Sequence, residues 1–98
     1  MKKMVVLYKT PADPEAFMSY YQDNHLPLVA KIPGLVRSEV TRLDRTLLGD
    51  GYFLMAEMYF ADADSFRTAM KSPENAATGA DLANFAEGLA TVMIGEAL

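Results

Sequence analysis

One histidine, His25, occurs in the chain, within the stretch YYQDNHLPLVAKIPG that spans residues 20–34. An imidazole titrates close to neutral pH, so it suits general acid or base chemistry. Tyr21 precedes it by four residues, and the two side chains share a face if the helix persists that far. A phenol can donate a hydrogen bond to a carbonyl or developing enolate while its ring lines an apolar pocket. His25 is therefore a candidate catalytic base, and Tyr21 a candidate orienting donor.

Structural roles explain the same residues about equally well. In such a role, His25 would stabilise the negative end of the first helix or bind a carbonyl that Pro27 leaves free. Tyr20 and Tyr21 would pack with their hydroxyls at the rim of the core. Both interpretations stay open on the sequence alone.

Glu57 is the one charged residue in the apolar run YFLMAEMYF, residues 52–60. Burial of an unpaired carboxylate is costly, so we expect an ion pair with Arg37 or Arg42, on the neighbouring strand or across a dimer. A catalytic acid with a raised pKa is the alternative.

Further along, the stretch GADLANF places Asp81 and Asn84 where they would lie at the mouth of a pocket. A helix N-cap explains Asp81 equally well. We expect the substrate-binding residues to be Phe17, Tyr20, Met58, Asp81, Asn84 and Phe85.

The composition narrows the function classes. There is no cysteine, and the net charge is −4 with scattered basic residues, so we expect neither a disulfide framework nor a nucleic-acid partner. The sequence has no glycine-rich phosphate loop, serine elbow or histidine pair for zinc or iron, and we predict no metal and no cofactor. The apolar run after MKK is too short for a signal peptide, and no run is long enough to cross a membrane. We expect a cytoplasmic protein.

The elements that must position these residues follow from periodicity and turn signals, within one domain over residues 1–98. Strands are predicted at residues 4–9, 35–43, 52–60 and 88–98. A first helix capped by Asp13 should end or kink near residues 24–26, before Pro27. A second helix follows Asp62 or Asp64, and a third covers residues 74–87.

This order, βαββαβ, predicts a ferredoxin-like α+β sandwich with one four-stranded antiparallel sheet and helices on one face. The first and third strands should be central, and the polar strand at 35–43 should lie at an edge. Three strands are apolar on both faces, however, so the uncovered face would expose an apolar patch. We therefore predict a homodimer formed by packing sheet on sheet.

The run YYQDNHLPLVAKIPGL, followed by AEMYFADADSFRTAMKSPENAATGADLANFA, resembles the EthD family, named for a protein linked to the degradation of ethyl tert-butyl ether. The resemblance covers essentially the whole chain and implies a dimeric α+β barrel. Many EthD-like sequences have a second histidine beside the first, where this chain has Asn24.

The resemblance implies a mostly apolar pocket between sheet and helices that binds a small hydrophobic organic molecule. Related barrels include cofactor-free monooxygenases, cyclases, decarboxylases and isomerases, in which His25 would serve as the base. A non-catalytic binding or accessory protein for an oxidative degradation system is the alternative. A haem bound by His25, as in some haem-degrading relatives of this fold, is a weaker alternative.

Overall fold

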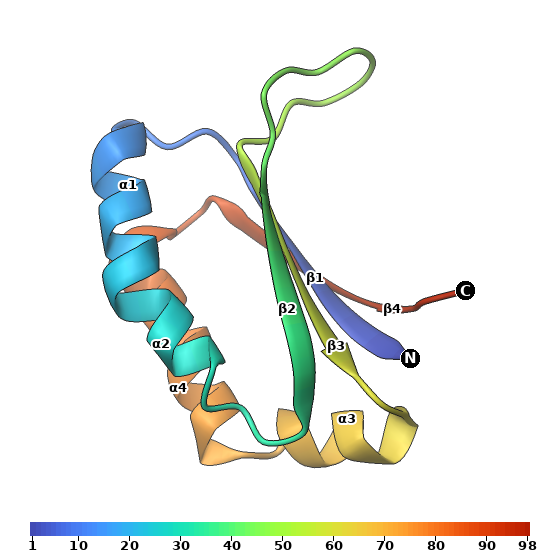
Figure 1. Cartoon of the computed structure of the whole chain (residues 1–98). Coiled ribbons are helices and arrows are strands. Elements are labelled where there is room, and N and C mark those ends of the chain that lie inside the picture. The colour runs from blue at the N-terminus through green and yellow to red at the C-terminus, as the bar shows by residue number, and fades with distance from the viewer.

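The computed structural model describes residues 1–98 and joins all the strands in one antiparallel sheet (Figure 1). The strands are β1 (Lys2–Tyr8), β2 (Leu35–Arg42), β3 (Leu54–Phe60) and β4 (Ala90–Glu96). The helical segments are α1 (Pro14–Tyr20), η1 (Tyr21–His25), α2 (Leu26–Val29), α3 (Ala63–Met70) and α4 (Pro73–Phe85). The strand order in space is β2-β3-β1-β4, which confirms the predicted ferredoxin-like α+β fold.

The strand positions agree with the apolar pattern of the sequence. β1 pairs with both β3 and β4, and β3 pairs with both β1 and β2, so the first and third strands are central. The polar strand β2 lies at one edge, as predicted. Figure 1 shows the helices on one side of the sheet, with the other face uncovered. None of the helices combines the length and apolarity needed to cross a lipid bilayer.

The core fills the space between the sheet and the helices. Alternate residues of β1 and β3 face the helices, and Tyr8, Leu54 and Phe60 among them are almost fully buried. Phe17 meets them from α1, and its ring lies 5.4 Å from that of Tyr8 and 5.6 Å from that of Phe53, each measured between centroids in an edge-to-face arrangement. The aromatic rings therefore fix how α1 sits on the sheet.

The first helix does not end before Pro27, but its regular α pattern is interrupted over residues 21–25, close to the predicted end or kink. After α1 the chain makes one wider turn, η1, in which the Leu26 amide donates to the Tyr21 carbonyl five residues back. α2 then continues to Val29. Pro27 lies in the first turn of α2, where the wider pattern changes back to the α pattern, so its missing amide hydrogen interrupts little.

The helices after β3 begin at side-chain caps. Asp62, one of the two predicted caps, accepts from the Ser65 amide at 2.8 Å and begins α3. The Ser72 hydroxyl accepts from the Asn75 amide at 3.1 Å and begins α4. Asp81 therefore lies well inside α4, and its interpretation as an N-cap is wrong.

The sheet face away from the helices carries an ion pair that differs from the predicted one. Lys3 Nζ lies 2.8 Å from Glu57 Oε2, whereas neither Arg37 nor Arg42 of the same chain pairs with this carboxylate; a pairing across a dimer stays a prediction. Lys3 precedes the strand start expected at residue 4, but β1 begins at Lys2 and lies directly beside β3. The hydrogen bond from Lys3 holds the pKa of Glu57 below its usual value, so the alternative of a raised-pKa acid is wrong too.

Candidate functional site

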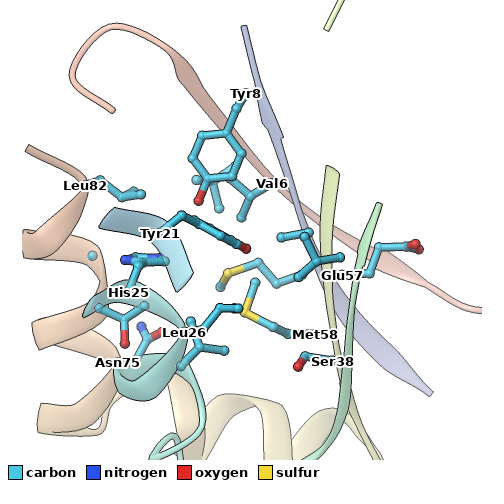
Figure 2. A pocket seen from close by; sticks show the side chains of 17 residues that line it. Val6, Tyr8, Tyr21, His25, Leu26, Ser38, Glu57, Met58, Asn75 and Leu82 are labelled. Atoms are coloured by element: carbon cyan, nitrogen blue, oxygen red, sulfur yellow. The ribbon is translucent and has the colours of Figure 1, made fainter. Parts of the chain in front are cut away.

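A cavity of about 160 Å³ lies between the sheet and the helices (Figure 2). Residues of the strands form one side, and residues of η1, α2 and α4 form the other. The apolar lining comes mainly from Met4, Val6, Leu26, Val29, Ala56, Met58 and Leu82. The polar lining residues on this face are Tyr8, Tyr21, His25, Ser38, Asn75 and Thr78. The site thus combines a mostly apolar lining with a few polar groups, as small-molecule sites commonly do.

His25 lies at the last position of η1, with only 4% of its side chain exposed. Its Nδ1 lies 2.9 Å from Oδ2 of Asp81 on α4. An ionised carboxylate can only accept a hydrogen bond, so Nδ1 carries the proton of the neutral ring. Nε2 is then the nitrogen that is left for a molecule in the cavity.

The Asp81 carboxylate is held by three donors. Tyr20 donates to Oδ1 at 2.6 Å, Asn84 donates to the same oxygen at 2.9 Å, and His25 donates to Oδ2. Burial alone would raise the pKa of Asp81, but the three hydrogen bonds outweigh it and the pKa lies below its usual value. Asp81 therefore stays ionised at neutral pH and fixes both the tautomer and the orientation of His25.

Two tyrosines reach the cavity from opposite sides. Tyr8 comes from β1 and Tyr21 from η1, and each residue is only 1% exposed. Burial raises the pKa of Tyr21 to about 12 and raises that of Tyr8 as well, so both phenols stay protonated at neutral pH. The Tyr21 ring also stacks on His25, with 5.5 Å between the ring centroids. Both tyrosines are therefore available as neutral hydrogen-bond donors.

No lysine or arginine lines the cavity. Glu57 borders it through the strand, but Figure 2 shows its side chain pointing away from the helices, where Lys3 binds it. The Thr78 hydroxyl donates a hydrogen bond to the Glu74 carbonyl at 2.9 Å within α4. The cavity therefore offers no fixed positive charge for an anionic ligand.

The structure brings only some of the predicted site residues to this cavity. His25, Tyr21 and Met58 line it, whereas Asp81 lies behind His25. The other predicted residues line a shallow hollow of the surface near α1 and the end of α4, namely Phe17, Tyr20, Asn84 and Phe85. Tyr20 and Asn84 nevertheless connect to His25 through the carboxylate of Asp81.

Sequence reasoning missed Tyr8 and the pairing of His25 with Asp81. Tyr8 lies in a strand that is apolar on both faces, so alternation alone does not say which side chains face the helices. Asp81 is 56 residues from His25 in the chain, and only the packing of α4 against η1 joins them. The one available signal was a lone acid between apolar residues in GADLANF.

No cluster of three or more histidine, cysteine, aspartate or glutamate side chains is arranged to hold a metal ion. The titratable groups that line the cavity on its helix side are one imidazole and two phenols.

Comparison with known families and structures identifies relatives of this chain. A family model described as the EthD domain matches residues 9–88. A protein from Rhodococcus erythropolis, described as an uncharacterized 11.0 kDa protein in the thcB-thcC intergenic region, is 36% identical over 95 residues, with 95% of this chain and 91% of that protein covered.

Solved structures extend the comparison. The crystal structure of an ethyl tert-butyl ether d (EthD) family protein from Bacillus halodurans is 42% identical, with 100% of this chain and 99% of that chain covered and a TM-score of 0.93. SnoaB from Streptomyces nogalater, a cofactor-independent oxygenase, is 20% identical, with 98% of this chain and 91% of that chain covered and a TM-score of 0.70. The likeness to SnoaB shows the fold alone.

Proposed function

The chain belongs to the EthD family, and from that premise we propose that it binds a small hydrophobic organic molecule in the cavity and removes a proton from it with His25. The reaction is cofactor-free and driven by proton transfer, as in cyclisation, isomerisation, decarboxylation or oxygenation of an activated carbanion. Tyr21 orients the substrate by donating a hydrogen bond.

One observation carries this proposal: His25 is the sole histidine, it lines the cavity, and a buried carboxylate holds its Nδ1. The neutral form of an imidazole held in this way has its free lone pair on Nε2, which is the group that a general base needs. The apolar lining of the cavity strengthens polar interactions within it, because the local dielectric constant is lower than that of water. SnoaB gives a precedent on the same fold for chemistry without a cofactor.

Hydrogen exchange at carbon tests the proposed chemistry directly. The probe is 2-indanone, a small ring ketone whose CH₂ groups next to the carbonyl exchange with D₂O once a base removes a proton. Proton NMR follows the loss of this signal with the full-length protein. Because general-base catalysis contributes about 10²–10⁴-fold, His25→Ala should lower the protein-dependent rate at least 100-fold. Equal rates for the wild type and His25→Ala, with both folded by circular dichroism, would sink the proton-transfer role.

A matched control separates catalysis from general damage. Tyr52 lies in the β2–β3 connection and does not line the cavity, so Tyr52→Phe should keep the wild-type exchange rate.

The apolar lining also suits a second function, a protein that carries an apolar compound for a partner oxidase without reacting with it. Binding of 2-indanone without any exchange that depends on His25 would favour this carrier function over catalysis.

We also propose that two copies form a homodimer through the uncovered face of the sheet. Val5, Leu7 and Met55 lie on this face and are only half-buried in one chain. The Lys3–Glu57 ion pair lies beside them on the same face. Sheet-on-sheet packing would bury this apolar area, which a lone chain leaves in contact with water.

A further inference from the structure

We propose that Tyr8 and Tyr21 form a two-donor site for a single uncharged oxygen of the ligand, so that the ligand class is a small neutral ring ketone or its enol. This inference rests on the proposed function for the position of the reacting carbon, and it adds the group that is recognised and the charge of the ligand.

The first argument is that both hydroxyls lack a protein partner. Neither Tyr8 nor Tyr21 makes a side-chain hydrogen bond, although only 1% of each residue is exposed. Every side-chain nitrogen or oxygen that is sealed inside the protein does have a partner. Both hydroxyls must therefore open to the cavity that their residues line. A buried donor without a partner is costly, so a ligand that supplies an acceptor is favoured.

The second argument is that the two phenols lie next to each other. The ring centroids of Tyr8 and Tyr21 are 5.8 Å apart, and the ring planes stand at 77°. Figure 2 shows both hydroxyls pointing into the space between the sheet and η1. They arrive from different elements, so one carbonyl oxygen with two lone pairs can accept from both.

The third argument concerns charge. No lysine or arginine lines the cavity, and the only group there that can become cationic, His25, is already paired with Asp81. A carboxylate or phosphate ligand would leave water without gaining a cation, which is unfavourable. The raised pKa values of both phenols support the same conclusion, because burial disfavours negative charge at this point. The cavity is thus built for a neutral ligand.

The fourth argument is size. The cavity volume of about 160 Å³ is comparable to that of apolar protein cavities that hold one benzene-sized molecule. A ligand with one ring, or two small fused rings, fits this space.

The two-donor site also explains how proton removal by His25 would proceed. His25 Nε2 takes a proton from the carbon next to the carbonyl, and the C–H electron pair becomes part of a C=C bond. The carbonyl π electrons move onto the oxygen, which becomes an enolate. The negative charge therefore develops on the atom that Tyr8 and Tyr21 contact, where donors lower the barrier most.

Binding of a matched pair of ligands tests the site. Isothermal titration calorimetry is carried out on the full-length protein with 2-indanone and with indane, which has the same ring skeleton without the oxygen. The wild type should bind 2-indanone more tightly than indane. One hydrogen bond contributes about 3- to 10-fold in affinity. Tyr8→Phe and Tyr21→Phe should therefore each weaken the binding of 2-indanone by that factor. The affinity of both variants for indane should stay within about twofold of the wild-type value, because the rings and their packing are retained.

The controls address folding and charge. Neither hydroxyl has a protein partner, so both variants should keep the wild-type melting temperature, and Tyr52→Phe should bind both ligands as the wild type does. Indane-2-carboxylate should bind at least tenfold more weakly than 2-indanone. Any of three outcomes would overturn the two-donor site. The carboxylate could bind more tightly than 2-indanone, or the wild type could bind indane and 2-indanone with equal affinity. The third outcome is an unchanged affinity for 2-indanone in both tyrosine variants.

Failure of this inference is distinguishable from failure of the proposed function. If 2-indanone binding depends on both tyrosines but His25→Ala leaves exchange unchanged, the oxygen site stands and the proton-transfer role falls. If exchange depends on His25 but binding does not depend on either phenol, the proton-transfer role stands and the two-donor site falls.

Discussion

Oδ2 of Asp81 lies 2.9 Å from Nδ1 of His25, although the two residues are 56 positions apart and neither side chain is more than 8% exposed. The contact joins the middle of α4 to the last position of η1. It turns an isolated histidine into an oriented pair whose free nitrogen is defined, and the behaviour of Asp81 variants follows from it.

Asp81→Asn should impair exchange more than binding. An asparagine amide in this place cannot accept from three donors as a carboxylate does, so His25 loses its fixed tautomer. We expect the exchange rate of 2-indanone to fall about 10-fold or more, while its dissociation constant changes less than about threefold. Asp81→Glu should restore part of the rate. A parallel loss of binding and rate would mean that Asp81 serves the fold alone.

Asp81 also makes stability depend on acid pH. Its folded-state pKa is below the value of about 3.9 in an unfolded chain, so ionised Asp81 stabilises the fold above that pH. The contribution is lost as the pH falls from about 3.9 through the lower folded-state value. Urea unfolding should therefore show the largest gap between wild type and Asp81→Asn at pH 5–7 and a smaller gap at pH 3. A gap that is constant from pH 7 to pH 3 would contradict an ionised Asp81.

At alkaline pH the buried phenols should ionise late. Burial raises the pKa of Tyr21 to about 12, whereas an unfolded tyrosine ionises near 10. The neutral phenol therefore stabilises the fold below pH 10, and this contribution disappears as the pH rises through about 12. Absorbance at 295 nm should show an incomplete tyrosine titration at pH 11 while circular dichroism still reports a folded chain. Tyr21→Phe should remove one of the late steps.

The aromatic core should be sensitive to loss of volume at Phe17. This side chain is 4% exposed and packs against the rings of Tyr8, Phe53 and Phe85. Truncation of a buried phenylalanine costs about 3–5 kcal/mol, so Phe17→Ala should lower the free energy of unfolding by about that amount in urea titrations. Leu48, at 95% exposure in the β2–β3 connection, provides the control, because Leu48→Ala should change stability by less than about 0.5 kcal/mol.

The uncovered sheet face should respond to an added charge. Met55 is half-buried on that face, so Met55→Lys would place an unpaired cation in the proposed dimer contact. Sedimentation velocity should show a dimer for the wild type and a monomer for Met55→Lys at the same concentration. Ser19→Lys, on the exposed side of α1, should remain dimeric. A monomeric wild type would end the dimer proposal.

Much of the fold could be predicted because local pattern and global packing agree. The most apolar strands are central, the polar one is at an edge, and Asp13 with Pro14 marks the start of α1. The candidate site is harder to predict from the sequence than the fold. The wide turn η1 depends on hydrogen bonds that have no sequence signature. Pro27 predicted an end or a kink of the helix near this point, but not the wide turn that occurs there.

The remaining errors come from relationships between distant segments. An arginine partner is expected for Glu57 when the register is unknown. The register places Val5 opposite Glu57 and Lys3 diagonally from it on the same face, from where Lys3 forms the ion pair. The role of Asp81 depends on which side of α4 faces η1, and a weakly amphipathic helix gives little indication of that side.

The wide turn η1 has a consequence for how this protein tolerates change in length. A turn that closes five residues back holds one residue more than an ordinary helical turn does. Deletion of a single exposed residue there, such as Gln22, would let the helix close normally, and the two flanking halves would keep nearly the same orientation because the wider turn had absorbed the extra residue. Phe17 would then stay in the core and His25 would stay at the cavity. The segment between these two residues should thus tolerate the loss of one residue, and relatives that share the site should vary here in residue count as well as in residues.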